Sequence, residues 1–186
     1  VGGTRILFSY NKKMKLFNIL FLVLILTFPS YSKVNMTIDQ ALEKYFPGLD
    51  IKKEKVYLTK KLVKDLTEKA ESRFQSRVFT YYEAASGSNR KFTAFVITHK
   101  LRTRTQTLFI VFDNGGRMKS SEVIAFYEPE EYIMSGSWFK QFYNKTLPAQ
   151  MPKYNEIIRV ANSTISYNET TKAIKRVANL YSLIYN

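Results

Sequence analysis

The sequence predicts an α+β fold: an antiparallel sheet of hairpins flanked by helices, in a single domain that follows an N-terminal signal peptide. The chain has 186 residues, enough for one domain with a real core once a leader is removed. Its middle contains short runs of aromatic and β-branched residues separated by turn residues, the pattern of successive hairpins. Apolar residues at three- and four-residue spacing on either side of these runs indicate helices. Hairpins between helices are typical of an α+β domain.

Residues 1–32 have the features of upstream sequence followed by a signal peptide. Met14 and the lysines around it precede an apolar run over residues 19–28, and small residues end the segment at Ser32. We expect cleavage after Ser32 and export to a periplasmic or other extracytoplasmic location. The alternative is an uncleaved N-terminal membrane anchor, for which the apolar run is short.

Charge and composition exclude several classes of function. The chain has a net charge of +14, and the first 32 residues contribute four basic and no acidic residues, which leaves 25 basic and 15 acidic residues after them. These basic residues are spread along the chain, and an exported protein is a poor candidate for nucleic-acid binding, so we expect no nucleic-acid partner. With no cysteine and one histidine, we also expect no disulfide and no metal site.

Residues 33–74 are predicted to form an N-terminal extension of helices and one strand. Thr37 and Gln40 have the spacing of a capping box, which starts a short helix that ends at Pro47. Residues 51–58 are predicted to form a strand. Residues 59–72 form an amphipathic pattern, with four apolar side chains expected to face inward: Leu62, Val63, Leu66 and Ala70.

The sheet is predicted from four further runs. We expect strands over residues 77–85, 91–100, 105–113 and 118–127. Residues 108–112 are continuously apolar, which predicts burial on both faces of the sheet. Asn114 and two following glycines tolerate positive φ, so they predict a tight hairpin turn before the last strand.

The C-terminal segment predicts a helix that starts beside an anion site. Ser166 and Glu169 have the spacing of a capping box. After them, apolar residues recur on one helical face: Ala173, Ile174, Val177, Ala178 and Tyr181. A helix N-terminus presents unpaired N–H groups and partial positive charge, and small residues upstream leave its backbone accessible. Such a place suits an anion, most naturally a phosphate.

The loop and this helix resemble the C-terminal motif of the FMN-binding-domain family, which includes flavin-carrying subunits of sodium-pumping NADH:quinone reductases and related complexes. The family pattern is Ser/Thr-Gly-Ala-Thr-x-Ser/Thr before a helix, and its last Thr can carry FMN through a phosphoester bond. Here the segment reads Ala161-Asn162-Ser163-Thr164-Ile165-Ser166. Thr164 and Ser166 match the pattern, whereas Ala161 and Asn162 depart from it. The resemblance implies FMN at Thr164, bound covalently or noncovalently.

Further segments upstream resemble the same family, and its motifs occur in the expected order. Residues 108–126 are similar to its central hairpin, and Glu128 and Pro129 stand where many members have Glu-Thr-Pro-Gly. Residues 136–142, which include Trp138, resemble a short Trp-containing helix. Residues 98–105 resemble a segment of a secreted subgroup. The likeness covers roughly residues 75–182, which implies an FMN-binding-like domain over residues 75–186.

The resemblance implies a role for each candidate residue. The phosphate would be held by Asn162, Ser163, Thr164, Ile165 and Ser166, and the loop with Glu128, Pro129 and Trp138 would close over the flavin ring. The alternatives are a solvated loop carboxylate for Glu128 and a core position for Trp138. His99 is either catalytic or a packed, hydrogen-bonded side chain, and Arg102 pairs either with the phosphate or with solvent.

The implied function is that of an exported FMN-binding protein that carries electrons. It would be reduced and reoxidised by redox partner proteins at or near the membrane, and a flavin transferase would attach a covalent flavin. No catalytic acid–base pair or activated nucleophile is evident in the sequence, which favours an electron-transfer protein over a stand-alone enzyme. Two alternatives remain open: a flavin-free binding or structural module of the same fold, and the flavin domain of an extracytoplasmic reductase.

Overall fold

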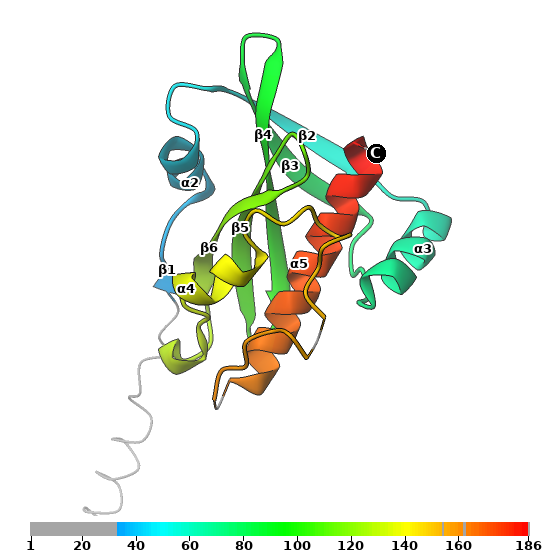
Figure 1. Ribbon diagram of the computed structural model, residues 1–186. Helices are drawn as coiled ribbons and strands as arrows, with labels where there is room; N and C mark the ends of the chain where they lie inside the picture. Colours follow the sequence, from blue (N-terminus) through cyan, green and yellow to red (C-terminus); the bar gives the residue numbers. More distant parts are fainter. Residues whose placement is uncertain (1–32, 154, 162, 186) are drawn as a thin grey trace, which may run out of the picture. The chain divides into compact units, whose positions relative to one another are not determined.

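The computed structural model describes residues 33–153, 155–161 and 163–185 (Figure 1). These described residues belong to one compact unit. The predicted signal peptide and its cleavage site after Ser32 lie outside the described residues and stay a prediction. Of the helices that the structure describes, none combines the length and the apolar character needed to cross a bilayer.

The predicted antiparallel sheet is confirmed, and it has six strands. Five of them follow one another as a meander, and the short first strand pairs with the last, giving the order β1-β6-β5-β4-β3-β2. The strands are β1 (Lys33–Val34), β2 (Asp50–Tyr57), β3 (Val78–Ser86), β4 (Asn89–Lys100), β5 (Thr105–Asp113) and β6 (Met118–Phe126). The predicted strands agree with β2 to β6 to within two residues at their ends.

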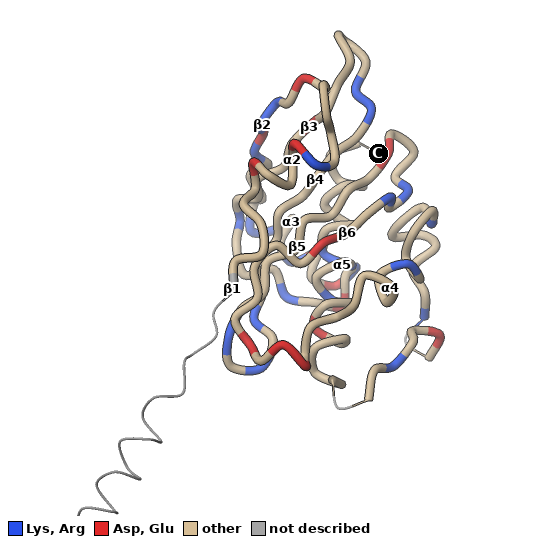
Figure 2. The backbone as a smooth tube through the Cα atoms, turned by 90° about the vertical axis from the view of Figure 1, so that its left-hand side faces the viewer, with Lys and Arg blue, Asp and Glu red and all other residues tan. Residues whose placement is uncertain are grey.

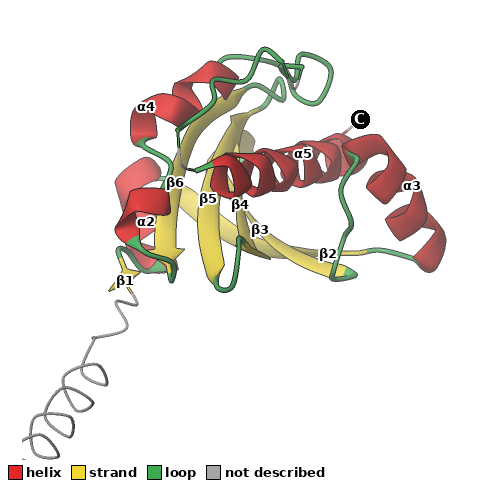
Figure 3. Cartoon of the chain, turned by 90° about the horizontal axis from the view of Figure 1, so that it is seen from below, coloured by secondary structure: helices red, strands yellow, loops and turns green. Residues whose placement is uncertain are grey.

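Helices cover both faces of the sheet. They are α2 (Ile38–Tyr45), α3 (Lys60–Ala70), α4 (Gly136–Phe139) and α5 (Thr164–Tyr185), with two short 3-10 helices, η1 (Glu130–Tyr132) and η2 (Lys140–Phe142). Figure 3 shows α5 lying across one face, with α3 and α4 beside it, whereas α2 lies on the opposite face. The predicted Thr37–Gln40 capping box at the start of α2 is confirmed.

Side-chain alternation along β5 separates two apolar cores. Leu108, Ile110 and Phe112 pack into the larger core under α5, whereas Phe109 and Val111 pack into the smaller core under α2. All five side chains are buried, as predicted for a strand covered on both faces. This alternation explains why the run is continuously apolar.

The largest helix, α5, is docked through the predicted face. Ala173, Ile174, Val177 and Tyr181 are all buried. The Tyr181 ring stacks on Phe112 with centroids 5.0 Å apart, and its hydroxyl donates to the Asp113 carbonyl at 2.8 Å. Gly116 in the adjoining hairpin turn has φ of +73°, and an added Cβ would lie 3.1 Å from the Tyr181 ring. Both the turn and the helix contact therefore require glycine there.

The predicted start of the last helix is wrong. α5 begins at Thr164, so Ser166 lies inside its first turn and is not the N-cap residue. The reason is that the helical hydrogen bonds begin earlier, with the Tyr167 N–H donating to the Ser163 carbonyl at 3.0 Å. Glu169 pairs with Lys172 at 2.6 Å instead of completing a capping box with Ser166.

Candidate functional site

The first turn of α5 combines exposed and buried side chains in a way that suits an anion. Thr164 and Ile165 are exposed, whereas Ser163 and Ser166 are buried. The Ser163 hydroxyl donates to the Glu131 carbonyl at 3.3 Å, but among the described residues the Ser166 hydroxyl has no hydrogen-bond partner. Asn162 lies outside the described residues. A buried hydroxyl without a partner costs free energy, and the start of this 22-residue helix has unpaired backbone N–H groups beside it.

Glu128 is buried and holds the turn between β4 and β5. Its carboxylate accepts hydrogen bonds from the backbone N–H groups of Thr103 at 2.6 Å and Arg104 at 2.7 Å. Burial would raise the pKa of Glu128, but these hydrogen bonds outweigh burial and hold the pKa below its ordinary value. The alternative of a solvated loop carboxylate is therefore wrong, because only 6% of the residue is exposed.

Residues 128–132 connect this turn to the loop before α5. Pro129 precedes η1, whose last residue, Tyr132, lies under the guanidinium of Arg102 at 5.2 Å from the ring centroid. The neighbouring Glu131 carbonyl accepts the hydrogen bond from Ser163. Since the β4–β5 turn and the end of β6 share one end of the antiparallel sheet, the fold brings these candidate residues together there.

Trp138 is a core residue. It is 4% exposed, and its ring packs edge-on against Phe139 and Phe142, with centroids 5.2 Å and 5.3 Å away. Its indole N–H donates to the Ile158 carbonyl at 2.8 Å. Of the two alternatives for Trp138, burial favours the core position, from which the residue supports the loop that leads to α5.

His99 belongs to a buried polar network under α5. Its Nε2 lies 3.1 Å from the amide nitrogen of Gln106, which also donates to the Thr170 hydroxyl at 2.8 Å. The other ring nitrogen, Nδ1, has no hydrogen-bond partner within the described part of the chain. Burial, and secondarily the charge of Arg176, lowers the pKa of His99 to about 3. His99 is therefore neutral near pH 7 and is packed and hydrogen-bonded rather than exposed to a reactant.

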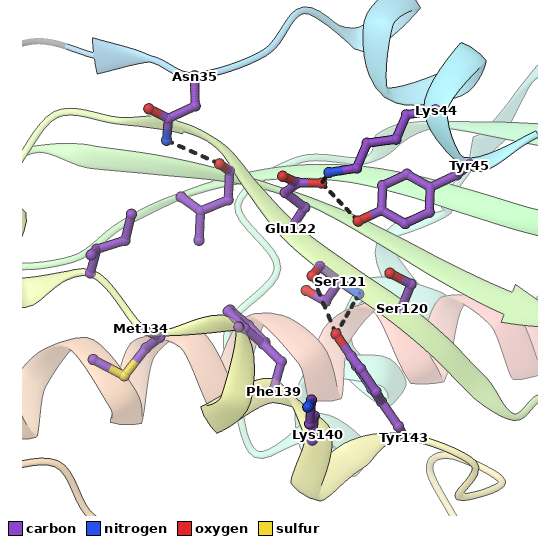
Figure 4. Close-up of a pocket in the computed structure, with 13 residues that line it drawn as sticks. Asn35, Lys44, Tyr45, Ser120, Ser121, Glu122, Met134, Phe139, Lys140 and Tyr143 are labelled. Carbon is purple, nitrogen blue, oxygen red and sulfur yellow. Dashed lines mark hydrogen bonds and ion pairs between the residues drawn. The ribbon is translucent and has the colours of Figure 1, made fainter.

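A cleft of about 490 Å³ lies away from these residues, over the outer edge of β6 (Figure 4). Lys44 and Tyr45 of α2 both contact the Glu122 carboxylate, at 2.6 Å and 2.7 Å. On the far wall the Tyr143 hydroxyl accepts from the Ser121 N–H at 3.1 Å. Sequence analysis missed this cleft, because residues from α2, β6 and η2 line it and no short motif links them. None of the candidate flavin residues lines it.

We also examined where the basic side chains and the possible metal-ligating side chains of the described residues lie. Figure 2 shows lysines and arginines distributed over many elements rather than gathered on one. Within the described part of the chain, no group of three or more His, Asp or Glu side chains is arranged to hold a metal ion.

No protein-family model matches this chain, and a search of curated proteins finds no matching relative. The resemblance to FMN-binding domains therefore rests on the motifs alone. Its candidate residues come from four separate segments of the sequence. Contacts connect the Arg102 turn, the 128–132 segment and Ser163, whereas the contacts of Trp138 and His99 are with other residues.

Proposed function

We propose that this chain is an exported FMN-binding protein that carries electrons between redox partner proteins outside the cytoplasm. The observation that carries the proposal is the first turn of α5, where an exposed Thr164 is followed by a buried Ser166 whose hydroxyl has no partner among the residues that the structure describes. The unpaired N–H groups and the partial positive charge of a helix start favour a phosphate at this position.

The residues present fit the phosphate end of FMN. Thr164 offers an accessible hydroxyl, and the backbone N–H groups of Thr164 and Ile165 belong to the unpaired start of the helix. The Ser166 hydroxyl would gain the partner that it lacks. Ser163 has a different role. Its hydroxyl already donates to the Glu131 carbonyl and so connects the loop before α5 to the 128–132 segment.

The flavin ring needs an apolar surface with polar groups at its edge. Trp138 does not supply that surface, because it is buried beneath the loop. Ile165, with 46% of its surface exposed beside Thr164, is the apolar side chain best placed to contact the ring. When bound, FMN supplies reversible electron and hydride transfer, and the protein supplies binding, orientation and electrostatics.

Covalent attachment and noncovalent binding remain two forms of this proposal. The exposure of Thr164 supports access by a flavin transferase. Ala161, in place of the family's Ser/Thr, and Asn162, in place of its Gly, favour noncovalent binding, because a transferase reads the residues around its target. The same two departures favour the second candidate function, a flavin-free module of the same fold.

The test is to purify the protein after coexpression with a flavin transferase and to record its visible spectrum. For a covalent flavin, we expect acid-precipitated protein to stay yellow and a Thr164 peptide to gain the mass of FMN less water. Thr164→Val then abolishes both signals. For a noncovalent flavin, acid releases the colour and Thr164→Val weakens binding by about 1–3 kcal/mol, the value of a hydrogen bond to a charged group.

The matched control is Thr98→Val, the same chemical change at an exposed position of β4 that bonds only Thr107, at 2.9 Å. We expect this variant to retain its flavin. Protein that is colourless after coexpression and that shows no FMN binding by titration would overturn the flavin proposal and support the flavin-free module.

A further inference from the structure

We propose that Arg102 selects phosphorylated flavin over unphosphorylated flavin, and that Glu128 is the positioning residue that holds Arg102 in place. This inference rests on the proposed function and names what determines its ligand specificity. It assigns Glu128 a role different from contact with the flavin ring, because the Glu128 carboxylate is already occupied by protein hydrogen bonds.

Glu128 fixes the backbone on which Arg102 stands. Its Oε1 accepts from the N–H groups of Thr103 and Arg104, at 2.6 Å and 2.7 Å, and from the Thr103 hydroxyl at 3.1 Å. Hydrogen bonds to a buried carboxylate are stronger than those between neutral groups. The turn over residues 101–104 is therefore held by the end of β6 in addition to its own strands.

Tyr132 holds the guanidinium of Arg102 on the 128–132 segment, which also contacts Ser163. The guanidinium carbon lies 5.2 Å from the Tyr132 ring centroid, within the range of a cation–π contact. The preceding residue, Glu131, accepts the Ser163 hydrogen bond at 3.3 Å, and Ser163 directly precedes Thr164. Two consecutive residues of η1 thus link Arg102 to the start of α5.

An acidic side chain nearby makes a cation such as Arg102 important for binding a phosphate. Glu131 is an exposed acidic residue of the same segment. Its negative charge disfavours a phosphate unless a cation opposes it. A guanidinium forms bidentate hydrogen bonds with phosphate oxygens, and an arginine already held on an aromatic ring loses less freedom on binding. Riboflavin has no phosphate, so its affinity does not depend on this cation.

The experiment compares FMN and riboflavin by fluorescence titration of apoprotein made without a flavin transferase. For wild-type protein we expect tighter binding of FMN than of riboflavin. Arg102→Gln should weaken FMN binding by roughly 10- to 100-fold and leave riboflavin binding unchanged. The matched control is Arg117→Gln, which removes an arginine in the β5–β6 turn, at the opposite end of the sheet.

Glu128→Gln tests the positioning role, because a merely structural defect would weaken both flavins in proportion. We expect a loss of FMN affinity with unchanged riboflavin affinity. Should Glu128→Gln fail to fold, Tyr132→Leu tests the same point, since it removes only the half-buried ring that supports the guanidinium.

Two results would overturn the inference, and they differ in what they say of the proposed function. An FMN-to-riboflavin affinity ratio that is the same in wild type and Arg102→Gln overturns the role of Arg102 and leaves flavin binding intact. Wild-type protein that binds neither flavin overturns both.

Discussion

At Ser166 we expect ligand binding and the stability of the apoprotein to favour different side chains. It is 1% exposed, and its hydroxyl bonds nothing in the described structure. A side chain retained only for stability would be alanine at this helical position, because alanine buries no polar atom and has the higher helix propensity. The Ser166 hydroxyl therefore adds no stability to the apoprotein through a hydrogen bond to the described residues.

We expect Ser166→Ala to raise the free energy of unfolding of the apoprotein by up to about 1 kcal/mol, because it removes an unsatisfied buried hydroxyl. The same change should weaken FMN binding. Chemical denaturation and flavin titration measure the two effects. Ser163→Ala is the control, because it removes a hydroxyl that bonds Glu131 and should destabilise the apoprotein. A loss of apoprotein stability in Ser166→Ala would show that the Ser166 hydroxyl does form a stabilising hydrogen bond in the apoprotein.

At the scale of elements, α5 joins the candidate site to the core. Its first turn supplies Thr164 and Ser166, and its later turns pack on the sheet through Ile174, Val177 and Tyr181. The position of the first turn therefore depends on the packing of the rest of the helix. A change that undocks the helix should affect both stability and ligand binding.

We expect Val177→Asp to lower the free energy of unfolding by several kcal/mol, because Val177 is 1% exposed and the variant buries an unpaired charge. Lys172→Asp is the control, since it adds a carboxylate to an exposed position of the same helix and should cost about 1 kcal/mol or less. Thermal unfolding distinguishes the two variants. An unchanged melting temperature for Val177→Asp would show that α5 is not held through this face.

For the whole molecule, one histidine sets the pH at which acid begins to destabilise the fold. His99 is the chain's only histidine, and burial lowers its pKa from 6.5 to about 3. Between these values the unfolded chain binds a proton that the folded chain does not. His99 therefore contributes stability that is fully present above pH 6.5 and is lost progressively as the pH falls toward 3.

We expect the free energy of unfolding to fall by up to about 1.4 kcal/mol per pH unit as the pH drops from 6 to 5, above the range of the carboxylates. His99→Gln should remove this slope while the steeper loss below pH 4.5 remains, since the depressed pKa of Glu128 acts there. Urea unfolding at several pH values measures how the free energy of unfolding of both proteins depends on pH. Equal wild-type stability at pH 6.5 and pH 5 would show that His99 protonates freely in the fold.

The sequence by itself determined the fold class and most of the elements. Strand and helix periods report local geometry, so the apolar run at 108–112 and the face with Val177 predicted burial correctly. The Thr37 capping box was equally readable, because both partners lie within one turn. The capping box at Ser166 failed because the same spacing also occurs inside a helix, and only the ladder of backbone hydrogen bonds decides where the helix begins.

Only the tertiary structure decided what surrounds each candidate residue. Whether Glu128 is solvated or buried depends on Thr103 and Arg104, which come together with it only because β4, β5 and β6 pair. The core position of Trp138 likewise depends on packing against Phe142 and on a hydrogen bond to the distant Ile158. Burial and hydrogen bonding between segments far apart in the chain are properties of the assembled sheet, and no local pattern records them.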